Sequence, residues 1–152
     1  MNQLTNIGDF HFSLKAGMRG NEYMPNTIEY MFTCGRAIKD QGTGLFTYVD
    51  AFGNLFIPRN SDSLIQSFFV VGRLHAATGG NIKVETTYIS PDGIRSAPSI
   101  VVGEILPGFV DFACYFPIAK FTQIGKHYLK IKLQEEELEA GNKFYFEVRK
   151  QE

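Results

Sequence analysis

Few side chains in this sequence have the chemistry that metal binding or catalysis needs. The three histidines are His11, His75 and His127, and the only two cysteines are Cys34 and Cys114. None of them falls in a Cys-x-x-Cys or His-x-x-x-His spacing, which is the arrangement typical of zinc sites. His127 precedes Tyr128 at a predicted strand start, where we expect a surface or capping role. We therefore expect no metal ion and no cofactor.

A cysteine nucleophile would need an exposed thiolate close to an imidazole. Cys34 and Cys114 instead share the alternation of the large apolar residues around them, so we expect both on the core side of their strands. Such a pattern predicts two reduced, buried and unreactive thiols. No Ser-His-Asp or Cys-His arrangement stands out elsewhere. We therefore expect no catalytic residue and no enzymatic activity.

Acidic and glycine-rich segments point to turns rather than to bound ions. The aspartates are single and dispersed, whereas calcium-binding C2 sandwiches gather several carboxylates at one end. The short glycine segments, 41–44 and 78–80, precede no helix and no Lys-Ser/Thr pair that could hold a phosphate. Both kinds of segment are typical of loops between strands.

Positive charge is present but balanced. The chain has 15 Lys and Arg against 16 Asp and Glu, a formal net charge of −1. Lys130 and Lys132 would share one face with Tyr145 and Arg149, but Glu147 lies in the same row. We interpret this face as an ordinary solvated surface and expect no nucleic-acid partner. No apolar run reaches the roughly 18 residues of a membrane span, so no membrane partner is expected.

The elements that must position these residues alternate with a period of two. Alternating or continuous apolar segments separated by Gly, Pro and Asn turns predict about eight strands. The segment 64–74 is apolar on both faces, which is typical of a central strand. Gly53-Asn54 predicts a tight turn, and Pro117–Ile124 predicts a crossing, with one turn of helix as an alternative. The fold class predicted is an all-β, antiparallel, immunoglobulin-like or C2-like sandwich with one core, formed by Phe32, Phe68, Val70, Val84, Phe112, Ile131 and Phe146.

The stretch from Ile28 to Val148 resembles a known family. The resemblance rests on the hairpin segments 30–34 and 43–49 with the Phe-Ile-Pro end at 56–58, the Ser-Pro-Asp-Gly turn at 90–93, and the segment 125–131 followed by a C-terminal hairpin. These motifs are similar to those of a family of small bacterial single-domain β-sandwich proteins of uncharacterised function. The resemblance implies a fold and a bacterial source, and it implies no activity.

Residues 1–27 lie outside that resemblance and form a predicted N-terminal arm, followed by the sandwich domain 28–152. Within the arm, Phe10, Phe12 and Leu14 form a strand-like apolar stripe that would remain in water in a free tail. We expect the stripe to add a strand to the chain's own sheet or, as an alternative, to a second copy. Residues 1–9 lack a basic segment followed by an apolar run, so a cytoplasmic location is expected.

The function expected from these features is a non-enzymatic interaction module. It would act through protein–protein contacts or self-association, which fits 14 Phe and 7 Tyr in a chain of 152 residues with only 20% charged residues. The alternative is a sandwich that binds a small ligand or carbohydrate on a concave sheet face. The absence of Trp counts against the usual sugar-stacking sites.

Overall fold

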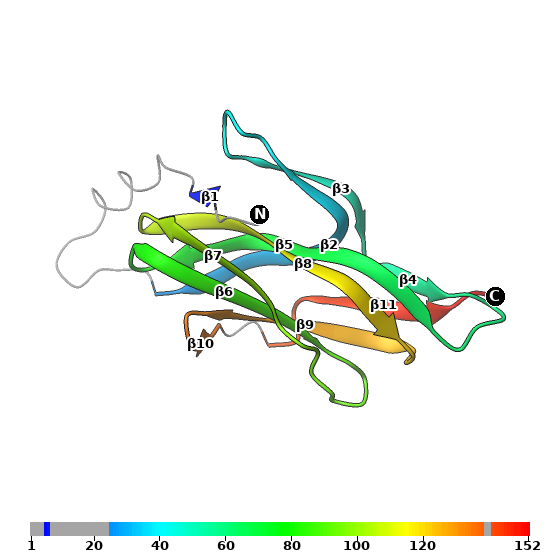
Figure 1. The fold of residues 1–152 in the computed structure, drawn as a ribbon. Coiled ribbons are helices and arrows are strands. Elements are labelled where there is room, and N and C mark those ends of the chain that lie inside the picture. Colours follow the sequence, from blue (N-terminus) through cyan, green and yellow to red (C-terminus); the bar gives the residue numbers. More distant parts are fainter. Residues whose placement is uncertain (1–4, 7–24, 139–140) are drawn as a thin grey trace.

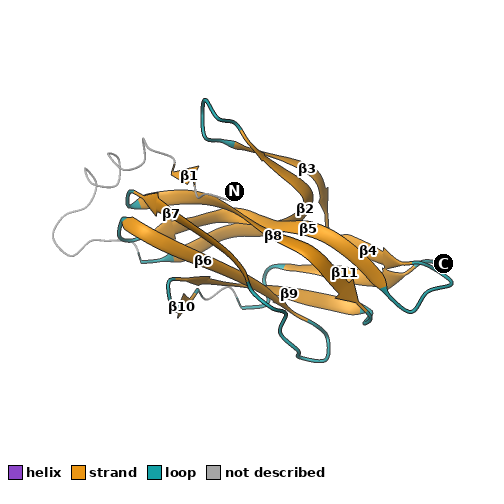
Figure 2. Cartoon of the chain, in the orientation of Figure 1, coloured by secondary structure: helices purple, strands orange, loops and turns teal. Residues whose placement is uncertain are grey.

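The chain folds into two β-sheets packed face to face (Figure 1). The structure, a computed structural model, describes residues 5–6, 25–138 and 141–152. In these ranges the regular elements are all strands, joined by turns and loops (Figure 2). The same ranges contain no helix of the length and apolarity that crossing a membrane requires. The predicted all-β sandwich is therefore confirmed.

Sheet A has five strands, and all of its neighbours are antiparallel. Its central strand β5 (Leu64–Ala76) pairs with a long strand on each side, which confirms the prediction of a central strand, and both of its faces are largely buried from Phe68 onward. The order across the sheet is β1 (Thr5–Asn6), β8 (Gly108–Phe121), β5, β2 (Thr27–Lys39) and β3 (Phe46–Phe52).

Sheet B covers the other side of the core. Its order is β4 (Asn54–Ile57), β11 (Tyr145–Lys150), β9 (Gly125–Leu133), β6 (Gly80–Ile89) and β7 (Ser99–Ile105), and β10 (Glu136–Glu137) pairs with β9. The neighbours are antiparallel except β4 and β11, which run parallel with Leu55 opposite Val148.

The predicted tight turn at Gly53-Asn54 is wrong, because the chain crosses there from sheet A to sheet B. Strand β3 ends at Phe52 in sheet A, and β4 begins at Asn54 in sheet B. The crossing places Leu55 and Ile57 in the core, where they are 9% and 2% exposed. Burial of these two apolar side chains favours the crossing over a hairpin, which would have kept both strands in one sheet.

Aromatic rings join the two sheets in the core. The Phe68 ring of β5 lies 5.0 Å from Phe116 of its own sheet and 5.7 Å from Phe146 of sheet B, measured between ring centroids. Tyr88 of β6 packs on the same ring at 6.0 Å. The other predicted core residues that lie in this cluster are Val70, Val84, Phe112 and Ile131.

Phe32 was predicted in the core and lies on the opposite face of sheet A. It packs against a second cluster formed by Cys34, Val71 and Ala113. Strand β2 has a register shift between Ile28 and Tyr30, after which Met31 faces the core. The sequence correctly predicts that Phe32 and Cys34 share one face of the strand. Because both faces of this sheet carry apolar residues, the alternation does not show which face points to the core.

The predicted crossing at Pro117–Ile124 is present but shorter than expected: β8 continues as a strand to Phe121 without a helical turn, and the chain crosses from sheet A to sheet B over residues 122–124. The pairing of β5 and β8 shifts register near Pro117, between Gln66 and Phe68. Pro117 lies in the irregularity, where a residue without an N–H is tolerated in a sheet. The Ser67 hydroxyl donates a hydrogen bond to the Pro117 carbonyl at 2.7 Å, which satisfies that group locally.

Candidate functional site

The residues proposed from sequence as an interaction arm, Phe10, Phe12 and Leu14, lie outside the described residues. Of the arm, β1 is described, and it pairs with β8 of the same chain, Thr5 opposite Asp111 and Asn6 opposite Val110. The far end of the arm is fixed at β5, because the Asn26 side chain accepts a hydrogen bond from the Ala77 N–H at 2.7 Å. The role of the apolar stripe stays a prediction.

Both cysteines are free and buried, but they lie on different faces of sheet A. Cys114 is in the core between the sheets, as predicted, whereas Cys34 belongs to the outer cluster with Val71 and Ala113. Burial raises the pKa of the Cys34 thiol to about 11 and that of Cys114 to about 12. At neutral pH both are therefore thiols rather than thiolates, which is the inert form.

His127 was expected at the surface and is in fact buried in the core, at 1% exposure. Its ring stacks on Phe146 with a centroid distance of 5.1 Å, and its Nδ1 lies 3.1 Å from the Gly125 carbonyl. Burial lowers the pKa of this imidazole. His127 alternates in β9 with the inward-facing Leu129 and Ile131, so the period of two correctly places it in the core. The expectation of a surface position came from its polar side chain.

The outer face of sheet A carries a second aromatic cluster. Cys34, Val71 and Ala113 are at most 1% exposed there. The end of the β2–β3 hairpin folds over them, with Tyr48 meeting the Phe32 ring edge-on at 5.1 Å. The three residues of this cluster are thus covered within one chain, whereas Ile65 of β5 and Ile118 of β8 in the same sheet are 64% and 78% exposed.

An ion pair lies beside this cluster. Arg73 of β5 and Asp111 of β8 are directly opposite in the ladder, and Nε of Arg73 donates to the Asp111 carboxylate at 2.9 Å. The Asp111 side chain is only 6% exposed. The Arg73 guanidinium also lies 5.9 Å from the centre of the Tyr30 ring, and burial raises the pKa of that tyrosine. The pair is satisfied internally and has the character of a structural contact.

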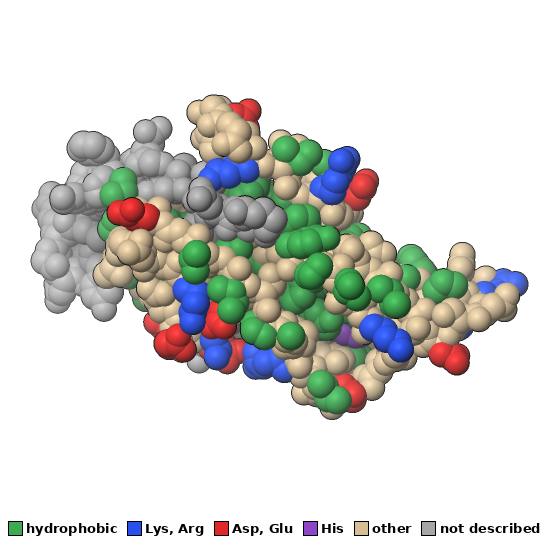
Figure 3. Space-filling model, in the orientation of Figure 1, with side chains coloured by type: hydrophobic (Ala, Val, Ile, Leu, Met, Phe, Trp, Pro, Cys, Tyr) green, Lys and Arg blue, Asp and Glu red, His purple; other side chains and the backbone are tan. Residues whose placement is uncertain are grey.

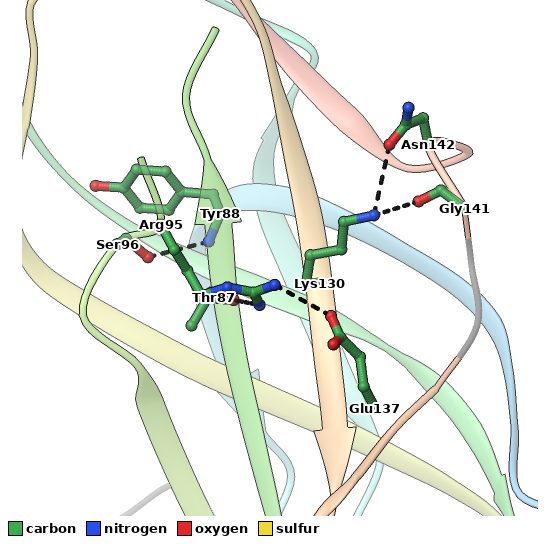
Figure 4. Close-up of polar contacts among 8 residues, drawn as sticks. All are labelled: Thr87, Tyr88, Arg95, Ser96, Lys130, Glu137, Gly141 and Asn142. Atoms are coloured by element: carbon green, nitrogen blue, oxygen red, sulfur yellow. Dashed lines mark hydrogen bonds and ion pairs between the residues drawn. The ribbon is translucent and has the colours of Figure 1, made fainter. Parts of the chain in front are cut away.

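The outer face of sheet B is charged, and most of its cations have partners. Lys83 lies 3.0 Å from Glu135, and Lys130 donates to the Gly141 carbonyl at 2.7 Å. Figure 4 shows the Arg95 guanidinium between two strands, with Nη1 donating to Thr87 at 3.0 Å and Nη2 to Glu137 at 3.3 Å.

A small pocket lies beside Arg95. Its volume is about 150 Å³, and its wall includes Thr87, Pro98 and Lys132. Ligand sites for drug-sized molecules are typically about 300–1,000 Å³. A wider and shallower hollow of about 530 Å³ follows the same face toward Val102 and Glu104. The two hollows lie at opposite ends of β7, the edge strand of sheet B.

Strand β7 exposes apolar side chains at the end of the strand order of sheet B, where no described strand pairs with its outer edge. Ile100 is 49% exposed and Val102 is 62% exposed, whereas Val101 between them is buried. Figure 3 shows hydrophobic side chains in a band over the region where β7 and β8 face the viewer in Figure 1. On its other side, β7 pairs with β6 over its whole length.

Among the described residues, two of the other edge strands carry features that discourage pairing with another chain, whereas β8 is covered by β1 only at Val110 and Asp111. Strand β4 has four residues and is followed by Pro58, and β3 is interrupted at Asp50, whose φ is 56°. Strand β1 has two residues. By contrast, β7 has seven residues, contains neither Pro nor Lys, and has no residue with positive φ. Sequence analysis identified β7 as a strand but missed its edge position, because strand order depends on the whole chain.

Comparisons with known proteins add little to this description. No family model matches the sequence, and no curated protein matches it. Among solved structures, the chain is similar to the CARDB domain of the PF1109 protein from Pyrococcus furiosus, described in complex with di-metal ions. The identity is 13%, the TM-score is 0.38, and the alignment covers 88% of this chain and 100% of that one. The bacterial family suggested by the sequence motifs is not shown by these comparisons.

Within residues 25–138 and 141–152, no group of three or more His, Cys, Asp and Glu side chains is placed to hold a metal ion.

Proposed function

We propose that this chain is a non-enzymatic interaction module that acts through contact with a protein, and that the contact is made at β7. The observation that carries the proposal is the exposed edge itself. It combines a row of backbone groups that pair with no other strand among the described residues and two apolar side chains, Ile100 and Val102. Strand addition to such an edge gains affinity from main-chain hydrogen bonds and specificity from alternate side chains.

The charged face next to β7 supports recognition rather than chemistry. Arg95 donates hydrogen bonds to both Thr87 and Glu137, as Figure 4 shows, and these contacts orient its guanidinium. A fixed charge at the rim of an apolar contact favours one partner orientation over others. The pocket beside Arg95 is smaller than typical ligand sites, and the larger hollow beside Val102 is wide and shallow, which favours a protein partner over the small-ligand alternative.

A photo-crosslinking experiment tests the proposal. A photoreactive amino acid replaces Val102 in the full chain, and a second chain carries it at Ile124, which is similarly exposed at 58% but lies outside the strands. We expect a discrete crosslinked species at position 102 in cells, with the bound chain identified by mass spectrometry.

The matched control adds Ile100→Lys to the chain labelled at position 102. This change places a charge in the apolar row while β7 remains paired with β6, so the crosslink should disappear. Equal crosslinking at positions 102 and 124, or an unchanged crosslink in the Ile100→Lys chain, would refute β7 as the contact site.

A further inference from the structure

We infer that the partner at β7 is a second copy of this chain, joined by antiparallel pairing of β7 with β7 across a two-fold axis. This inference rests on the proposed function and specifies its partner. An isologous contact requires a surface that is complementary to itself. The order of side chains along β7 meets that requirement when Val101 of each copy lies opposite Val101 of the other. Both the exposed apolar residues Ile100 and Val102 and the charged Glu104 then find partners.

The apolar residues select the register. If Val101 lies opposite its own copy on the inner side, Ile100 of each chain lies opposite Val102 of the other on the outer side. Both exposed apolar side chains then form cross-strand pairs, which stabilise antiparallel sheets. A shift by one residue on each strand would place Ile100 opposite Glu104, an apolar group against a charge.

The same register gives Glu104 a partner. This side chain is exposed, and the structure shows no ion pair or hydrogen bond for it among the described residues. In the paired sheet Glu104 of one copy lies opposite Pro98 of the other. Pro98 lines the pocket that also contains Arg95, so the carboxylate approaches that guanidinium; Lys132 of the same pocket lies further away on β9, opposite Glu85.

Neighbouring strands are about 4.8 Å apart. The β6–β7 ladder ends with Thr86 opposite Ser99, and continuing its register would bring Thr87 beside Pro98. The Arg95 guanidinium binds the Thr87 hydroxyl, so it lies next to that row. Long Glu and Arg side chains can span the remaining distance. Because the axis is two-fold, the charge contact occurs at both ends of the paired strands.

Sedimentation velocity over a concentration series tests the inference. The full chain should sediment as a dimer that dissociates on dilution. Ile100→Lys with Val102→Lys places lysines opposite lysines and should give a monomer at every concentration. The control is Ile38→Lys on β2, because Ile38 is exposed to the same 49% as Ile100, and it should leave the dimer intact.

Glu104→Lys tests the charge contact. It should weaken the dimer at least ~10-fold at low salt, with a smaller loss at high salt, because rim charges are screened.

The register of the paired strands is tested by oxidising a mixture of two cysteine variants. Ile100→Cys and Val102→Cys should form a disulfide with each other and neither should do so alone, since only directly opposite Cα atoms are close enough.

The outcomes separate this inference from the proposed function. A chain that is monomeric at the highest soluble concentration, or a dimer unaffected by the lysine pair, overturns the second copy as the partner at β7. In either case the Val102 crosslink still decides the proposed function, because capture of a different protein at that position would retain it. A disulfide between two Ile100→Cys chains would refute the register.

Discussion

Outward-facing apolar side chains differ in exposure between the aromatic cluster of sheet A and strand β7 of sheet B. On sheet A, outward-facing Val71 and Ala113 are at most 1% exposed, because aromatic rings of the same chain cover them. On sheet B, outward-facing Ile100 and Val102 remain 49% and 62% exposed at an unprotected edge. An apolar surface that is already covered has little left to gain from a partner, whereas one in water does. The difference between these two groups of residues favours the proposed contact at β7 over a contact at the aromatic cluster.

Substitutions in the core between the two sheets should cause the largest loss of unfolding free energy. Phe68 contacts five aromatic rings from both sheets, Phe52, Tyr88, Phe116, Phe121 and Phe146. Phe68→Ala should cost about 3–5 kcal/mol of unfolding free energy, through lost burial and the cavity left behind. Urea denaturation measures this loss. A melting curve equal to that of the unchanged chain would contradict the described core.

A pair of ion-pair variants compares the two faces directly. Asp111→Ala removes the carboxylate that Arg73 needs on sheet A, where the Asp111 side chain is 6% exposed. We expect a loss of about 1–3 kcal/mol, since a charge-assisted hydrogen bond disappears and a half-buried guanidinium is left unpaired.

The matched variant is Glu135→Ala on sheet B. Its ion pair with Lys83 is exposed, with the Glu135 side chain at 82%. Exposed pairs contribute little to stability, so the change in unfolding free energy should be small. Urea denaturation of both variants at low and high salt gives the comparison. Equal losses of unfolding free energy in the two variants would show that the buried ion pair of sheet A is no stronger than the exposed pair of sheet B.

A smaller effect arises on the inner side of sheet B, at His127. Burial lowers its pKa in the folded state, so the unfolded chain binds the proton more readily. The stabilisation from the neutral ring is therefore complete above the unfolded pKa of about 6.5 and is lost as pH falls below that value.

Unfolding free energies at pH 7.5 and at pH 5.5 should thus differ more for the unchanged chain than for His127→Phe, which keeps a ring beside Phe146. The readout is the pH slope and not the absolute stability, because the variant also loses the contact between Nδ1 and the Gly125 carbonyl. The same slope in both proteins would assign the acid sensitivity to other groups.

Local sequence patterns predicted the fold class well. Alternation identified β6 and β9, and the Ser-Pro-Asp-Gly turn forms as expected, with the Gly93 N–H donating to the Ser90 carbonyl at 2.8 Å and a φ of 86° at Gly93. Alternation fixes which residues share a face, because side chains point to opposite sides in turn. It does not say which face is inside when both are apolar, and for that reason Phe32 and Cys34 were misplaced.

The candidate site was less accessible from the sequence. Ile100 and Val102 read as an ordinary pair of strand residues, and a buried position would have suited them equally well. Their exposure follows from the position of β7 at the end of the order β4-β11-β9-β6-β7, which depends on contacts between distant segments. Arg95 becomes relevant only because the loop after β6 returns to Thr87.

Hydrogen–deuterium exchange of β7 tests the central claim most directly. Exchange is followed for residues 99–105 and, in the same protein, for 46–52 of β3 and 54–57 of β4, at low and at high protein concentration. The account predicts that backbone amides of β7 become slower to exchange in the concentrated protein while β3 and β4 do not change. Equal exchange of β7 at both concentrations, together with new protection of β3 beside the aromatic cluster, would contradict it.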